Sequence, residues 1–248
     1  MLTALALTLA LAPAPTEIKL TIDGTDRLAL VVAPAKISKP APVVFAYHGH
    51  GGNARYSVKK FKFQETWPEV ICVYPQGLPT KTPNDPQGRR NGWESTRSES
   101  NKDLKFADAL MKEVKKRYSV NDKQVFTMGH SNGATMTFML WAMRPNVYAG
   151  YGPCSAPGAR GVTVSKPAFI QIGESDEIVN VDLMHWSLSQ IKEVNGSKTP
   201  GKSLGKHLTE FAGKAPLQTY IYPGGHSLPD DVVPAMARFF RKIAQDQK

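Results

Sequence analysis

The sequence has few cysteines and few long apolar runs. Its two cysteines, Cys72 and Cys154, allow one disulfide at most, which excludes a disulfide-rich scaffold. Beyond the first residues no apolar stretch is long enough to span a bilayer, and no internal repeat is present. No group of His, Cys, Asp and Glu has the spacing of a metal site. We therefore expect no metal, no cofactor and no stable insertion into a membrane.

Acidic residues are also in the minority. The chain has 21 Asp and Glu against 31 Lys and Arg, for a formal net charge of +10. The basic residues are scattered, without interleaved aromatics or a nucleic-acid-binding motif, so we expect no nucleic-acid partner. The excess positive charge favours solubility and a weak attraction to acidic polysaccharides or cell surfaces.

The length and the apolar content fit one folded domain. A chain of 248 residues with 41% hydrophobic residues can bury one substantial core, which we assign to residues 16–248. Strand-like and helix-like runs alternate, which predicts a mainly parallel sheet with helices on both faces. The chain opens with an expected hairpin of residues 17–22 and 28–32 around Asp23 and Gly24.

Apolar spacing predicts the main helices. A capping-box pattern at Ser100 and Asp103 is expected to open a helix over residues 100–118. Residues 134–143 are apolar on nearly every side, so this helix should be buried against the sheet. Residues 231–244 form the last expected helix, which is amphipathic.

The pentapeptide GHSNG at residues 129–133 is the most informative motif. It follows a strand-like run, residues 124–128, and opens the helix-like run 134–143, which is the context that a G-x-S-x-G nucleophile elbow requires. A serine on such a strained turn crowds the positions two places before and after it, where glycine relieves the crowding. Ser131 is then placed to attack a carbonyl. The alternative is a glycine-flanked turn without chemistry.

A serine nucleophile needs a base, and three histidines follow Ser131. His185 lies in a run with helical spacing, and His207 lies in a loop or an edge segment. His226 follows a strand-like segment, residues 217–222, in a Pro-Gly-Gly turn that lets an imidazole reach a neighbouring loop. His226 is the best candidate, with a surface turn histidine as the alternative.

The orienting acid should follow another strand. Asp176 comes just after the apolar run 167–172, where its carboxylate can accept the imidazole N–H and stabilise the imidazolium. Its neighbours Glu174 and Glu177, and then Asp182, are the other candidates.

A glycine-rich loop supplies the candidate oxyanion hole. The sequence HGHGGN at residues 48–53 follows the apolar run 43–47, and the backbone N–H groups of His50 and Asn132 are expected to donate to the substrate oxygen. The rival interpretation is a phosphate cradle, but no G-K-[ST] follows these glycines. His48 and His50 resemble metal ligands only in isolation.

Two stretches are predicted as long loops, residues 76–99 and 195–206. The first contains Trp93, which either contacts the substrate or fastens the loop to the body of the protein. Trp93 and His48 are our candidates for substrate contact. No insertion is long enough for a lid domain, so we expect an open cleft suited to a polymer or a bulky ester.

Taken together, these motifs resemble the α/β hydrolases of the secreted polyhydroxybutyrate depolymerase and feruloyl esterase type, which overlap with carbohydrate acetyl esterases. The resemblance covers nearly all of the chain after residue 16. The matching segments are residues 48–53, 74–77, 103–106, 129–134, 173–176 and 223–226. The chain departs from many relatives at His50, where they carry a hydrophobic residue or cysteine, and at Lys102-Asp103, where they carry two aspartates.

The resemblance implies an α/β-hydrolase fold without a large lid domain and a catalytic triad of Ser131, Asp176 and His226. The implied activity is a serine carboxylic ester hydrolase that acts through an acyl-enzyme on short-chain or phenolic esters of a polysaccharide or polyester. The alternatives are a serine peptidase or acyltransferase of the same fold, or a non-catalytic binding protein. We expect a monomer. The family's strand order separates Cys72 from Cys154, which implies two buried thiols and no disulfide.

The first residues predict export. Residues 1–14 are apolar and end with Ala12 and Ala14 in an A-x-A arrangement, which is typical of a secretory signal peptide. We therefore expect residues 1–15 to be a signal peptide or a disordered tail, and the protein to be secreted or periplasmic. The alternative is a cytosolic protein with a frayed tail.

Overall fold

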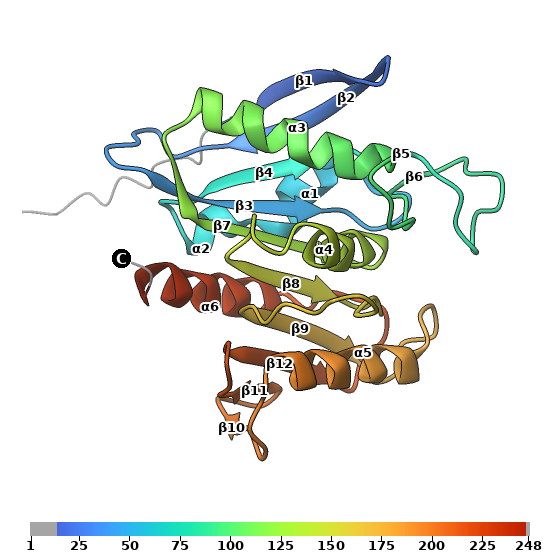
Figure 1. The fold of residues 1–248 in the computed structure, drawn as a ribbon, viewed down its shortest axis with the longest axis vertical. Coiled ribbons are helices and arrows are strands. Elements are labelled where there is room, and N and C mark those ends of the chain that lie inside the picture. The colour runs from blue at the N-terminus through green and yellow to red at the C-terminus, as the bar shows by residue number, and fades with distance from the viewer. Residues whose placement is uncertain (1–13, 247–248) are drawn as a thin grey trace, which may run out of the picture.

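The computed structural model describes residues 14–246 and is built around one large sheet (Figure 1). Ten strands follow one another in the order β1-β2-β4-β3-β7-β8-β9-β12-β11-β10. The signal peptide predicted at the N-terminus falls on residues that lie almost wholly outside this description. Within residues 14–246, no helix has the length and apolar character needed to cross a bilayer.

The elements have the following bounds. The strands of the large sheet are β1 (Thr16–Ile22), β2 (Thr25–Val32), β3 (Ala41–Tyr47), β4 (Ile71–Pro75), β7 (Val120–His130), β8 (Gly150–Cys154), β9 (Ala168–Gly173), β10 (Lys202–Ser203), β11 (Leu208–Phe211) and β12 (Leu217–Tyr222). A separate pair consists of β5 (Leu78–Pro79) and β6 (Asn91–Gly92). The helices are α1 (Ala54–Phe61), α2 (Phe63–Thr66), α3 (Lys102–Arg117), α4 (Asn132–Met143), α5 (Val181–Val194) and α6 (Val232–Asp246).

The centre of the sheet is parallel. Strands β4, β3, β7, β8, β9 and β12 run in one direction, and antiparallel strands complete both edges. At one edge β1 and β2 form the predicted hairpin, whose turn residues Asp23 and Gly24 have φ angles of 49° and 76°. Because the parallel strands point the same way, the loops after their carboxyl ends gather at one edge of the sheet.

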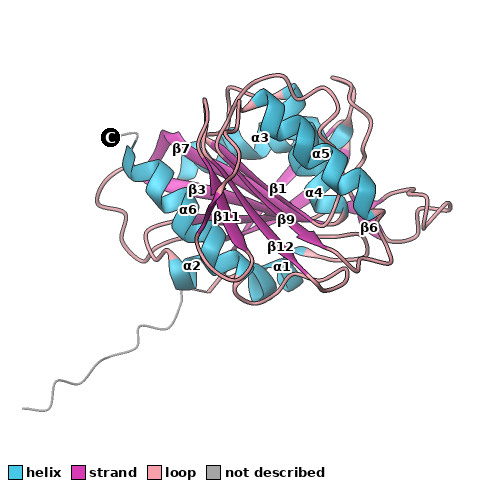
Figure 2. Ribbon diagram, turned by 90° about the horizontal axis from the view of Figure 1, so that it is seen from below, coloured by secondary structure: helices cyan, strands magenta, loops and turns pink. Residues whose placement is uncertain are grey.

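Helices cover both faces of the sheet, as the sequence predicts (Figure 2). On one face α3, α4 and α5 bury their apolar side chains against the strands, and on the other α1, α2 and α6 do so. The buried residues of α6 include Met236, Phe239 and Phe240, which match its predicted inward face. Helix α4 is buried over most of its length. The mainly parallel, doubly covered sheet is the α/β-hydrolase architecture expected from the sequence.

The predicted capping box of α3 is wrong. The cap is Asn101, whose side-chain oxygen accepts hydrogen bonds from the N–H groups of Asp103 and Leu104. An asparagine cap satisfies these donors by itself, so Ser100 is not needed. The carboxylate of Asp103 is therefore available for a different partner, the guanidinium of Arg27.

The Arg27–Asp103 ion pair is buried between β2 and α3. An Arg27 Nη2 to Asp103 Oδ1 distance of 2.6 Å joins two side chains that are 1% and 0% exposed. The other oxygen of Asp103 accepts the N–H of Glu94 at 2.7 Å, and Arg27 lies over the ring of Phe106 at 4.1 Å. The Asp103 carboxylate thus connects the N-terminal hairpin, α3 and the segment that follows β6.

The two cysteines lie on strands that are not neighbours. Cys72 is in β4 and Cys154 in β8, with β3 and β7 between them. Both are buried free thiols, as expected, and burial raises the pKa of Cys72 to about 12. Neither thiol has the lowered pKa that a cysteine nucleophile needs.

Replacing Arg27 by methionine should destabilise the protein by about 3 to 5 kcal/mol, because the Asp103 carboxylate would remain buried without its counter-ion. The free energy of unfolding in urea measures the effect. The matched control is Lys105→Met, which removes an exposed ion pair with Asp23 and should cost less than about 1 kcal/mol. Equal losses in the two variants would contradict this account.

Candidate active site

Ser131 lies on a sharp turn between β7 and α4. Its backbone angles are φ 58° and ψ −126°, a conformation that L-residues rarely adopt. A Cβ at Gly129 would collide with the carbonyl of Gly133, and a Cβ at Gly133 would collide with the carbonyl of Tyr47. The Ser131 N–H donates to the carbonyl of Cys154 at 2.9 Å. This is the geometry of a nucleophile elbow, and the two glycines are required by close backbone approach.

His226 lies within hydrogen-bonding distance of Ser131, and Asp176 lies within hydrogen-bonding distance of His226. His226 Nε2 is 2.8 Å from the Oγ of Ser131, and its Nδ1 is 2.7 Å from Oδ2 of Asp176. The second oxygen of Asp176 accepts the N–H groups of Ile178 and Val179, each at 2.9 Å. With both oxygens bonded, the carboxylate holds the imidazole in one orientation, with Nδ1 protonated and Nε2 free to accept the serine proton.

The parallel pairing of β9 with β12 brings the acid and the base together. Gly173 at the end of β9 pairs with Tyr222 at the end of β12, and any side chain at Gly173 would collide with the backbone of Gly224 and Gly225. The Ser175 N–H donates to the carbonyl of Gly224 at 2.9 Å. Two loops 50 residues apart in sequence are thereby held against each other.

The other candidates for acid and base lie elsewhere. Glu174 pairs with His185 at 3.0 Å in an exposed contact, and His207 packs against the rings of Tyr220 and Tyr222. The described contacts thus place Asp176, rather than Glu174, beside His226.

The glycine-rich loop after β3 lies beside Ser131. Tyr47 pairs with Gly129 in the β3–β7 ladder, and a Cβ built on Gly49 would be 3.3 Å from the Cβ of Ser131. Among the hydrogen bonds of residues 14–246, the backbone N–H groups of His50 and Asn132 have no acceptor. Both are therefore free to donate to a substrate oxygen.

His48 and Trp93 are buried and support the loop instead of contacting the solvent. His48 donates from Nδ1 to the carbonyl of Gly49 at 2.8 Å and accepts the Gly77 N–H at 2.9 Å. Burial lowers the pKa of His48 to about 4. The indole of Trp93 is 1% exposed, donates to the carbonyl of His48 at 2.8 Å and packs edge-on against Tyr47. These contacts show that Trp93 fastens the loop to the body of the protein. Trp93 also lines the pocket in front of Ser131, whereas His48 lies behind the loop, and a substrate contact by either side chain stays a prediction.

Two side chains that sequence reasoning overlooked hold the site together. The amide of Asn132 accepts the Trp93 N–H at 2.7 Å and donates to the Trp93 carbonyl at 3.0 Å. Oδ2 of Asp85 lies 3.1 Å from Nε2 of His50 and accepts the Arg90 N–H at 2.9 Å. Asn132 stands in the elbow motif, so its amide could have been considered, whereas no local pattern connects Asp85 to a histidine 35 positions away.

A pocket of about 530 Å³ opens in front of Ser131 and His226. The segment between β5 and β6, which we call the arm (residues 80–90), forms one wall, and residues 178–180 also line the pocket. Among the residues that the structure describes, no three His, Cys, Asp or Glu side chains are grouped so that they could hold a metal ion.

Comparison with known proteins identifies the fold and bears on the activity. No family model matches the chain. A bifunctional acetylxylan esterase/xylanase of Neocallimastix patriciarum is 23% identical over 176 residues, 69% of this chain and 24% of that protein. The probable feruloyl esterase C of Aspergillus flavus is 28% identical over 204 residues, 76% of this chain and 71% of that protein. The chain thus spans about a quarter of the bifunctional relative that it matches.

Solved structures share the fold. An acetyl xylan esterase from Aspergillus awamori superposes with a TM-score of 0.66 at 15% identity, covering 91% of this chain and 99% of that one. A ferulic acid esterase superposes with a TM-score of 0.65 at 12% identity, covering 93% and 98%. The chain has the α/β-hydrolase fold. Its sequence relatives and structural neighbours together support a carboxylic ester hydrolase, and the relatives include acetylxylan and feruloyl esterases.

His130, the residue before Ser131, packs against the ring of His226. The two rings lie 4.9 Å apart, and burial, followed by the charge of His226, lowers the pKa of His130 to about 4. Burial likewise lowers the pKa of His48 to about 4. A histidine with a folded pKa near 4 and an unfolded pKa near 6.5 binds fewer protons when folded, so its contribution to stability is present above pH 6.5 and lost as the pH falls toward 4.

The free energy of unfolding should therefore fall between pH 7.5 and 4.5 by about 2 to 3 kcal/mol for each of these two histidines. Urea titrations at several pH values measure this slope. His130→Gln should retain the fold and lose about half of the pH-dependent decrease. A slope in the variant as steep as in the wild type would show that His130 is not held neutral.

Proposed function

We propose that this protein is a serine carboxylic ester hydrolase in which Ser131, His226 and Asp176 form the catalytic triad. The observation that carries the proposal is the continuous chain of two hydrogen bonds, 2.8 Å from Ser131 to His226 and 2.7 Å from His226 to Asp176. The strained turn at Ser131 is a second, independent support, because such backbone conformations concentrate at functional sites.

The reaction follows from these contacts. His226 accepts the Ser131 proton at Nε2 while Oγ attacks the ester carbonyl, and the N–H groups of His50 and Asn132 stabilise the oxyanion. The protonated His226 then gives its proton to the leaving alcohol, which leaves an acyl group on Ser131. Water activated by His226 hydrolyses that ester bond and releases the acid. Asp176 keeps the imidazole oriented and stabilises its cationic form throughout.

The proposed substrates are esters of short-chain or phenolic acids, such as acetyl or feruloyl groups on a polysaccharide or a polyester. Two observations support them: the relatives are named acetylxylan esterase and feruloyl esterase, and the pocket in front of Ser131 holds about 530 Å³, within the size range of small-molecule sites. We assign this activity to a single catalytic domain over residues 16–248, acting as a monomer.

The alternative functions, an acyltransferase, a peptidase or a binding protein, would use parts of the same site. An acyltransferase or a peptidase of this fold would use the same acyl-enzyme and differ in the acceptor or in the leaving group. A purely binding protein has no need of a serine held in a strained turn and hydrogen-bonded to an oriented histidine. Adding an alcohol acceptor or a peptide amide to the assays below separates these activities from hydrolysis.

The proposed location is outside the cytoplasm. Its support is the apolar, Ala-rich stretch of residues 1–14 with its A-x-A arrangement. N-terminal sequencing of the protein after expression in its source, showing a start near residue 15, is the test.

Ser131→Ala should abolish release of ferulate from methyl ferulate and of acetate from an aryl acetate, with a loss of kcat of roughly 10⁴- to 10⁶-fold. The matched control, Ser189→Ala on the exposed side of α5, should retain wild-type rates. The ratio of the two rates in the wild type indicates the preferred acyl group. Hydrolysis that persists in a folded Ser131→Ala protein would overturn the assignment.

Asp176→Asn should lower kcat by roughly 10⁴-fold while leaving the fold intact, because the amide no longer selects the imidazole tautomer that accepts the serine proton. Glu174→Gln is the control, since Glu174 pairs with His185 away from Ser131. If Glu174→Gln caused the larger loss, Asp176 would not be the orienting acid.

A further inference from the structure

The pocket in front of Ser131 is lined by basic residues but by no acidic residue. Lys81 and Arg90, both from the arm, line it together with Ser131 and His226, whereas no aspartate or glutamate is among its lining residues. The proposed reaction makes no use of either cation.

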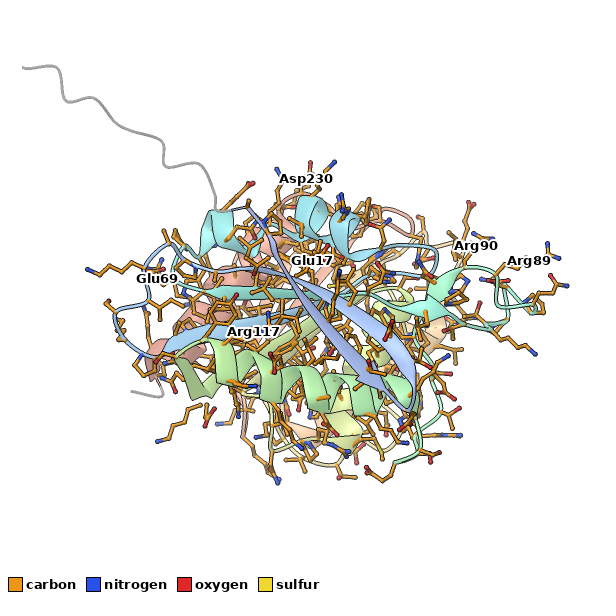
Figure 3. The ribbon with its side chains drawn as sticks, turned by 90° about the horizontal axis from the view of Figure 1, so that it is seen from above. Glu17, Glu69, Arg89, Arg90, Arg117 and Asp230 are labelled. Atoms are coloured by element: carbon orange, nitrogen blue, oxygen red, sulfur yellow. The ribbon has the colours of Figure 1, made fainter. Side chains whose placement is uncertain are left out.

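Arg90 is held close to the reacting centre. Its Cδ lies 3.4 Å from the position that a Cβ on Gly51 would occupy, so its aliphatic part rests on the loop that presents the His50 N–H. Its own backbone N–H is fixed by Asp85 at 2.9 Å. The arm thus keeps this side chain beside the oxyanion loop, although the side chain itself is exposed (Figure 3).

Neither cation is neutralised by a carboxylate. Among the ion pairs of residues 14–246, none includes Lys81 or Arg90. Asp85, the acidic residue nearest in the arm, is buried, and its Oδ2 is engaged by His50 and by the Arg90 backbone. Glu177 and Asp182 lie close in sequence to the lining segment 178–180, but they do not line the pocket.

The positive charges are therefore concentrated on the arm side of the pocket, where a bound ester would lie within their reach. A carboxylate placed there would gain two charge-assisted contacts without displacing an existing partner. Arg90 presents a planar fork that matches a carboxylate, and Lys81 adds a second, mobile charge.

We propose that Arg90 and Lys81 select ester substrates that carry a carboxylate close to the scissile bond, such as acyl groups on an acidic sugar chain or acids with a second, free carboxylate. This inference rests on the proposed ester hydrolase function, and it names the chemical class of substrate which that site prefers. Neutral esters remain substrates, because neither cation contacts Ser131, His226 or Asp176 in the structure.

The test uses two pairs of esters, in each of which a free carboxylate is compared with its neutral methyl ester. For the alcohol side, meta-acetoxybenzoate is compared with its methyl ester, and for the acyl side mono-para-nitrophenyl isophthalate, whose carboxylate cannot reach its own ester bond, is compared with its methyl ester. The wild type should have a higher kcat/KM for the anionic member of at least one pair, and the pair that shows it tells which side of the ester the cations face. The advantage should shrink as salt is raised, because exposed charges are screened.

Variants assign the effect to the two side chains. Arg90→Gln and Lys81→Gln should each lower kcat/KM for the preferred anionic ester by about two- to fivefold, mainly through KM, and change the neutral ester by less than about twofold. Arg89→Gln is the matched control. It removes the same charge from the adjacent position, and Arg89 does not line the pocket (Figure 3).

The outcomes are distinguishable. Equal rates for both members of each pair, equal losses for anionic and neutral esters, or an effect of Arg89→Gln as large as that of Arg90→Gln would each overturn the inference while leaving the hydrolase intact. Failure of the proposed function would instead appear as no turnover of any of the four esters, or as turnover that survives Ser131→Ala.

Discussion

The close approach of three backbone segments at Ser131 is the constraint on which the site depends. The end of β3, the end of β7 and the start of α4 come so near one another that a side chain at Gly129 or Gly133 has no room. This contact forces the serine into its strained conformation and leaves the first N–H of α4 free. It also brings the glycine-rich loop after β3 beside Ser131. The proposed nucleophile and the proposed oxyanion donors thus depend on one packing arrangement.

The other two members of the proposed triad depend on strand order. Because β9 and β12 are parallel neighbours, the loops after them meet, and Gly173 allows the turn before His226 to close against the start of the Asp176 loop. Hydrogen bonds fasten the arm, from Asp85 within it to His50 and from Trp93 just after it to the Asn132 amide. The glycine-rich loop and the elbow therefore both help to position the wall that carries Lys81 and Arg90. The buried Arg27–Asp103 pair extends this framework to the N-terminal hairpin.

Much of the architecture could be predicted because local patterns carry it. Apolar spacing predicted the hairpin and the helices now seen as α4, α5 and α6, and the elbow motif predicted the strand and helix on either side of Ser131. The predictions failed where several partners compete for one group. Ser100 and Asp103 fit a capping box, but Asn101 caps α3 and Arg27 takes the carboxylate. The sequence alone leaves the role of Trp93 open, because the burial of its side chain depends on what packs around it, here Tyr47 and His48.

By itself the sequence determined the class of fold and the candidate nucleophile, base and acid, because glycine spacing and strand–turn–helix order are local properties of the chain. Only the tertiary structure decided which groups touch. It selected Asp176 over Glu174 as the partner of His226, buried His48, connected Asp85 to His50 and left the two arm cations facing the pocket. The physical reason is that hydrogen bonds and charge pairs form between residues far apart in sequence, at distances set by strand order and loop packing.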